Sequence, residues 1–102
     1  MEEVKIIGFD GETLEIALSG DIDLGNAEAF YETVMREYKN APANVTFECE
    51  NLNFIDSTTL GTFVKILKSV KSNGYTMRLN GLQPKIKKLF LICSLDSIIE
   101  IA

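Results

Sequence analysis

The hydrophobic residues of this chain change their spacing several times, and this alternation limits the possible folds more than any other feature of the sequence. Leu14, Ile16 and Leu18 recur at every second position, which is typical of a strand with one buried face. Residues 24–38 instead carry apolar side chains at helical spacing, and residues 45–49 return to the two-residue period. The pattern therefore predicts strands separated by helices.

The remaining segments continue this alternation. Asp10-Gly11 is a strong signal for a tight turn between the first two strands. Asn73-Gly74 is typical of a helix end, and Pro84 suits the first turn of another helix. We expect strands at 4–9, 13–19, 45–49, 76–79 and 98–101, and helices at 24–39, 57–72 and 84–92.

The order β-β-α-β-α-β-α-β predicts a single α/β domain over residues 1–102. Right-handed crossovers through helices make neighbouring strands parallel, whereas a hairpin joins antiparallel strands. We therefore expect a mixed, mostly parallel sheet with an N-terminal antiparallel hairpin, flanked by helices. We also expect Asp23 to cap the first helix and Leu24 to begin its apolar stripe. Residues 50–56 are expected to form a loop that packs inward through Leu52, Phe54 and Ile55.

The composition argues against several kinds of chemistry. The chain has no histidine, which removes imidazole-dependent triads and most zinc sites. Its net charge of −5 gives no general attraction for nucleic acid. Cys49 and Cys93 lie among apolar residues and are expected to be buried rather than to bind metal. The acidic start and the lack of a long apolar run predict neither a leader nor a membrane span, so we expect a cytoplasmic protein without cofactors.

An acidic turn, Gly20-Asp21-Ile22-Asp23, follows the second predicted strand. Two carboxylates this close could bind a metal ion or act as an acid/base pair. Asp23 also has an ordinary role as a helix cap, and two carboxylates without further ligands make a poor metal site. We therefore favour surface recognition for Asp21 and Asp23.

A second candidate site, Asp56-Ser57-Thr58-Thr59, opens the second predicted helix. Asp, Ser and Thr side chains accept hydrogen bonds from the free N–H groups of a helix start, so capping alone explains these residues. A phosphate on Ser57 would meet the same donors and the positive end of the helix dipole, so the position also suits phosphorylation. Both interpretations stay open on local grounds.

The chain resembles the family of anti-sigma factor antagonists, the STAS domain, over nearly its whole length. Gly20-Asp21-Ile22-Asp23 is similar to the family's Gly-Glu-Leu-Asp. Residues 54–61, Phe-Ile-Asp-Ser-Thr-Thr-Leu-Gly, are similar to its aromatic-hydrophobic-Asp-Ser-Ser/Thr-Gly-Leu-Gly. The helix end at 71–74 and the helix at 84–90 also fall where the family has them.

This resemblance implies a partner switch rather than an enzyme. In the family, the unphosphorylated antagonist binds an anti-sigma factor serine kinase and so frees a sigma factor. Phosphorylation of the antagonist's serine separates the complex, and a phosphatase resets it. Carried onto this chain, the phosphorylated residue is Ser57, and Asp56 helps to orient the site. The partner-binding surface would comprise Asp21, Asp23, Asp56, Ser57, Thr58 and Thr59.

Thr59 departs from the family pattern, which commonly has glycine at this position. A β-branched residue there would narrow the approach to Ser57 and stiffen the first helical turn. Thr58 is an alternative phosphoacceptor. The alternative function is a non-switching STAS scaffold subunit of a stress-signalling or lipid-transport complex, although the presence of Asp56-Ser57 favours the antagonist.

Overall fold

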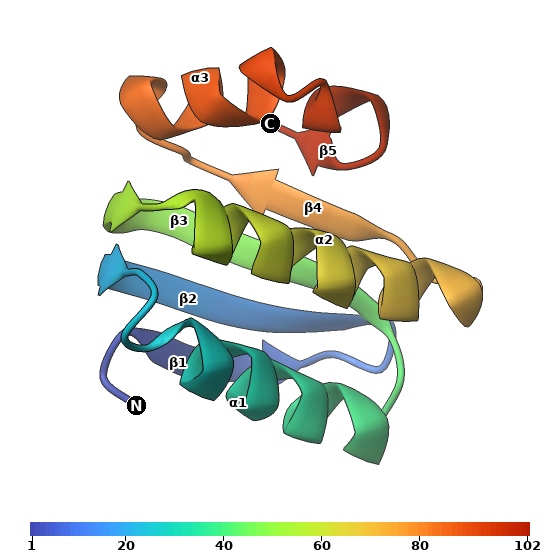
Figure 1. Ribbon diagram of the computed structural model, residues 1–102. Helices are drawn as coiled ribbons and strands as arrows, with labels where there is room; N and C mark the ends of the chain where they lie inside the picture. The colour runs from blue at the N-terminus through green and yellow to red at the C-terminus, as the bar shows by residue number, and fades with distance from the viewer.

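The computed structural model describes all residues, 1–102, and shows one five-stranded sheet with three α-helices (Figure 1). The strands lie in the order β1-β2-β3-β4-β5; β1 and β2 are antiparallel, and the other neighbouring pairs are parallel. The predicted mixed sheet with an antiparallel hairpin is therefore confirmed. The elements are β1 (Val4–Phe9), β2 (Thr13–Ile22), α1 (Ala27–Asn40), β3 (Asn44–Ile55), α2 (Ser57–Ser72), β4 (Met77–Asn80), α3 (Pro84–Ile92), a 3-10 turn η1 (Leu95–Ser97) and β5 (Glu100–Ile101).

The helices α1 and α2 lie side by side across one face of the sheet, and α3 lies beyond β4 (Figure 1). Four fully buried phenylalanines join these layers through edge-to-face contacts. Phe63 of α2 is central, with ring centroids 5.2 Å from Phe30 of α1, 5.5 Å from Phe47 of β3 and 5.5 Å from Phe90 of α3. This packing fixes α2 against both its neighbouring helices and the sheet.

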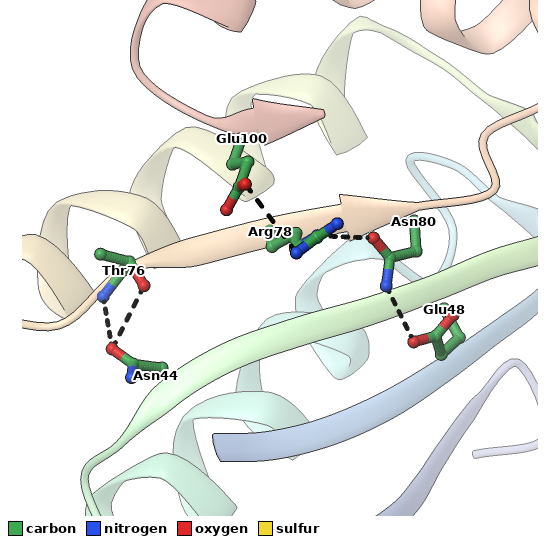
Figure 2. Close-up of polar contacts among 6 residues, drawn as sticks. All are labelled: Asn44, Glu48, Thr76, Arg78, Asn80 and Glu100. Atoms are coloured by element: carbon green, nitrogen blue, oxygen red, sulfur yellow. Dashed lines mark hydrogen bonds and ion pairs between the residues drawn. The ribbon is translucent and has the colours of Figure 1, made fainter. Parts of the chain in front are cut away.

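The opposite face of the sheet is polar, and this explains why the strands alternate although most of them are parallel. Parallel strands covered on both faces carry continuous apolar runs, whereas β2 and β3 have only one buried face. On the open face, Asn80 donates to Glu48 Oε1 (3.1 Å) and accepts from Arg78 Nε (2.8 Å), as Figure 2 shows. Arg78 also lies 3.8 Å from Glu100 of β5. Cross-strand polar contacts thus replace a second layer of helices.

Strands β2 and β3 are longer than predicted. Of the expected loop at residues 50–56, residues 50–55 are the end of β3 and Asp56 is the N-cap of α2. The two strands stay paired to their last residues, with Asp21 beside Phe54 and Ile22 beside Ile55. Pairing satisfies the backbone of this stretch although half of its side chains are polar, which the two-residue pattern did not reveal. Leu52 and Ile55 are buried as expected, but the inward packing expected for Phe54 is wrong, since its side chain is 47% exposed.

Two other expectations are corrected near the ends of elements. Leu24 does not belong to the apolar stripe of α1; it precedes the helix and is 76% exposed. Cys49 is buried as expected, and burial raises the pKa of its thiol to about 12, but Cys93 is exposed at the end of α3. The last strand is shorter than expected, Glu100–Ile101, because the backbone N–H groups of Ile98 and Ile99 still donate to the Leu95 carbonyl in the turn that closes η1.

Candidate functional site

The parallel pairing of β2 and β3 brings both candidate motifs to one edge of the sheet. Ile22 and Ile55 are register partners at the carboxyl ends of these strands. The residues that follow them, Asp23 and Asp56, therefore leave the sheet beside each other. The carboxyl edge of parallel strands is where α/β folds place their functional loops.

Asp56 is the residue that joins the two motifs. One carboxylate oxygen, Oδ1, accepts from the Thr59 backbone N–H (2.9 Å) and so caps α2. The other, Oδ2, accepts from the Leu24 N–H (2.8 Å) in the loop before α1. The bond to Thr59 and then the bond to Leu24 hold the pKa of Asp56 below its usual range, because both favour the charged form. A single ionised carboxylate therefore connects the starts of both helices.

Thr59 joins the first turn of α2 to the end of β2 from the buried side of the helix. Its side chain is fully buried, and its hydroxyl donates to the Ile22 carbonyl (2.6 Å) while lying 2.9 Å from Asp56 Oδ1. The expectation that Thr59 narrows the approach to Ser57 is wrong, because the side chain points into the protein. Burial likewise keeps Thr59 from touching a docked partner, so within the predicted surface it is a support and not a contact.

Ser57 is the first residue of α2 and is exposed, as is Thr58. The first turn of a helix has N–H groups without intrahelical partners, and Asp56 occupies only that of Thr59. An anion on Ser57 would also meet the positive end of a helix of 16 residues. The geometry required of a phosphorylation site, an accessible hydroxyl at a tolerant helix start, is therefore present.

Asp21 and Asp23 lie in the neighbouring segment, but Asp23 does not cap α1 as expected. The N-cap residue is Asn26, whose Oδ1 accepts from the Asp23 N–H (2.7 Å) and whose Nδ2 donates to the Asp21 carbonyl (3.0 Å). The Asp23 side chain instead accepts from the Gly25 N–H (2.9 Å) within its own turn. Asn26 was missed by sequence reasoning, although an Asn three residues after Asp23 is itself a common cap signal. The Asp21 side chain is exposed, and that of Asp23 is half-buried.

Two hollows flank this serine-bearing turn. One, of about 430 Å³, lies between α1 and α2 and is lined by Thr58 together with Leu24, Glu28, Glu32 and Lys65 among others. The second, of about 160 Å³, lies between the end of β3 and α3. The chain contains no cluster of three or more His, Cys, Asp or Glu side chains with metal-site geometry. None of its helices has the length and hydrophobicity needed to cross a membrane.

Comparison with known proteins identifies close similarities over almost the whole chain. The family model of the STAS domain matches residues 5–102. An anti-sigma-B factor antagonist of Bacillus subtilis (strain 168) is 29% identical over 89 residues, which cover 87% of this chain and 81% of that protein. The solved structure of TM1081 from Thermotoga maritima is also 29% identical, with a TM-score of 0.79, and covers 96% of this chain and 82% of its own.

The anti-sigma factor antagonist SpoIIAA has the same fold in two chemical states. Its unphosphorylated form gives a TM-score of 0.77 at 17% identity and covers 97% of this chain and 86% of its own. Its phosphorylated form, from Bacillus, gives a TM-score of 0.76 at 19% identity and covers 97% of this chain and 90% of its own. At these identities the likeness establishes the fold alone.

Proposed function

Because the chain belongs to the STAS domain family, we propose that it is an anti-sigma factor antagonist that binds an anti-sigma factor serine kinase and loses that partner when Ser57 is phosphorylated. The observation that carries this proposal is the exposed Ser57 at the first position of α2, beside a carboxylate fixed by three hydrogen-bond contacts. A kinase needs the hydroxyl accessible for in-line attack on the γ-phosphorus of ATP. The protein itself acts as a regulator, as the names of its relatives indicate.

The proposed switch has a local electrostatic cause. Phosphoserine carries about −1.5 to −2 charges at neutral pH. On Ser57 this charge would stand next to Asp56, on the edge that also bears Asp21 and Asp23. Docking against a partner would then require several negative groups to lose water together. A penalty of roughly 3 kcal/mol would lower the affinity about a hundredfold.

The fold should survive this modification. The phosphate would lie at the N-terminus of α2, where free N–H groups and the helix dipole favour an anion. The buried bonds of Thr59 lie on the inner side of the same turn and are not displaced. SpoIIAA, with the same fold, exists in both phosphorylated and unphosphorylated forms. A phosphatase that removes the group would therefore return the same docking surface, and a cytoplasmic location follows from the kinase's need for ATP.

The test combines phosphate mapping with calorimetry, using the anti-sigma factor kinase from the same genome and ATP. Wild type and Thr58→Ala should be phosphorylated at Ser57, whereas Ser57→Ala should not. Unphosphorylated wild type and Ser57→Ala should bind the kinase, and phosphorylated protein should bind about a hundredfold more weakly at an unchanged melting temperature. Equal affinities of wild type, Ser57→Ala and phosphorylated protein would mean that Ser57 has no switching role, and would favour the non-switching scaffold. Phosphate found on Thr58 would move the switch by one residue.

A further inference from the structure

The hollow between the end of β3 and α3 combines apolar walls with an unpaired cation. It is lined by Asn53, Phe54, Ile55, Lys85, Ile86 and Leu89. Phe54 and Leu89 remain 47% and 39% exposed, so two large apolar side chains face water around one small depression. Its volume of about 160 Å³ is below the roughly 300–1,000 Å³ of small-molecule sites, and suits one protein side chain better.

The walls of this hollow are held in place before any partner arrives. Gln83, at the start of α3, donates to Asn53 Oδ1 of β3 (3.0 Å). Gly81, with φ of +73°, lets the preceding loop approach β3 so closely that an added Cβ would lie 2.6 Å from Glu50 Cγ. Ile86 is buried beneath the hollow. A preformed recess loses little conformational entropy when it is filled, which favours its use as an anchor site.

The hollow is continuous with the proposed switch surface and differs from it in charge. Ile55, in its wall, is two residues before Ser57. Lys85 lines it, and the only ion pair within the chain is Arg78–Glu100, so no carboxylate of this protein neutralises Lys85. Across the end of β3, on its β2 side, lie Asp21, which is the register partner of Phe54, and Asp23. A partner that covers Ser57 therefore meets acidic groups on one side and an apolar recess with a cation on the other.

We propose that this recess is a specificity-determining anchor for the kinase partner, filled by one aliphatic or aromatic side chain whose neighbouring carboxylate pairs with Lys85. The inference rests on the proposed function, since the same kinase must cover Ser57. An apolar anchor in a pocket ringed by polar contacts is the usual form of an interface hot spot. The opposite charges on the two sides of the end of β3 would fix the orientation of the partner.

Two matched pairs of variants on α3 test this proposal. Leu89→Ser changes the recess, whereas Leu91→Ser changes a side chain of similar exposure, 45%, that points about 200° away around the helix. Lys85→Glu reverses the charge in the recess, and Lys87→Glu makes the same change about 200° away. A glutamate in the first turn of α3 is favourable to the helix, so Lys85→Glu should fold at least as well as wild type.

Calorimetry of the unphosphorylated variants with the same anti-sigma factor kinase should separate the pairs. Leu89→Ser and Lys85→Glu should bind roughly tenfold or more weakly, and Leu91→Ser and Lys87→Glu within about twofold of wild type. Equal binding by all four, with Ser57 still phosphorylated and released, overturns the anchor and leaves the proposed function intact. No binding or phosphorylation of wild type overturns both. If sedimentation shows a dimer that Leu89→Ser dissociates without affecting the kinase, the occupant is a second copy and the proposal is wrong.

Discussion

The starts of α1 and α2 look alike in sequence but are built differently. Each follows a buried strand of the parallel pair, and each has an aspartate directly after the last strand residue. At α2, Asp56 caps the helix at once, and Ser57 is already helical. At α1, Asp23 enters a turn, Asn26 takes the N-cap position, and no side chain bonds to the first-turn N–H groups.

This difference shows where the precision of the site comes from. The segment before α1 is fixed by bonds to other parts of the chain. The Leu24 N–H donates to the Asp56 carboxylate, and the Asn26 side chain bonds to the backbone of residues 21 and 23. The start of α2 is capped by its own N-cap residue, Asp56, and the buried hydroxyl of Thr59 bonds it to the Ile22 carbonyl of β2. Ser57 therefore lies at the more firmly fixed helix start, and the loop that carries Asp23 is positioned by its bond to Asp56 at that helix start. Substitutions at the two starts should have unequal effects.

Thr59→Gly should produce the largest effect, because it breaks the support of the α2 start. The substitution removes the buried hydroxyl, leaves the Ile22 carbonyl without its partner and adds backbone freedom within the helix. We expect the free energy of unfolding to fall by about 2–3 kcal/mol. Urea unfolding measures it, with Thr58→Gly as the control on the exposed neighbour, expected to lose about 0.5 kcal/mol or less. Equal losses in the two variants would mean that the buried hydroxyl contributes nothing.

Replacing each of the two aspartates separately with asparagine should affect the two helix starts unequally. Asp56→Asn keeps one acceptor oxygen and replaces the other with an amide donor, so it cannot cap α2 and accept from Leu24 at the same time. Asp23→Asn keeps the only oxygen that its side chain uses, the acceptor of Gly25 N–H. We expect thermal unfolding to show a fall of several degrees for Asp56→Asn and little change for Asp23→Asn. A larger fall for Asp23→Asn would reverse the assigned roles.

The sequence predicts the helices best where chemically distinct residues mark their ends. Asn73-Gly74 and Pro84 place the end of α2 and the start of α3 correctly, because a positive φ and a fixed φ leave few alternatives. The cap at Asp56 was also predictable, because aspartate is among the residues preferred at the N-cap position. Asp23 offered an equal local signal, and only the path of the chain out of β2 decides that Asn26 caps α1 instead.

Tertiary pairing accounts for most of what the sequence did not predict. Only three of the six residues at 50–55 are apolar, and this segment is strand because it pairs with the end of β2. Leu24 and Phe54 were expected inside because they are apolar, yet both are exposed beside the site. The bonds from Asp56 to Leu24 and from Thr59 to Ile22 span 32 and 37 residues, so no local pattern could reveal them. The exposure of these apolar side chains beside the site is visible only in the structure, where it points to a docking surface.

The smallest expected effect is the loss of the Asp56 contribution in acid. The pKa of Asp56 lies below its usual value because the Thr59 and Leu24 N–H groups bind the charged form. A carboxyl group with a lowered folded-state pKa contributes stability in full above its unfolded pKa, about 3.9, and loses it as the pH falls through the folded-state value. The stability of wild type relative to Asp56→Asn should therefore be constant above about pH 5 and shrink below about pH 4.

Urea unfolding midpoints of both proteins across this range give the test. Asp10, whose pKa is also lowered by the N–H groups of Glu12 and Thr13, is present in both proteins, so its acid sensitivity cancels in the difference. Thr33→Val on α1 is a neutral control, and its difference from wild type should not depend on pH. A wild-type advantage over Asp56→Asn that persists undiminished at low pH would show that the neutral carboxyl group holds the two helix starts as well as the carboxylate does. The bond between the Leu24 N–H and the Asp56 side chain would then not depend on the negative charge of Asp56.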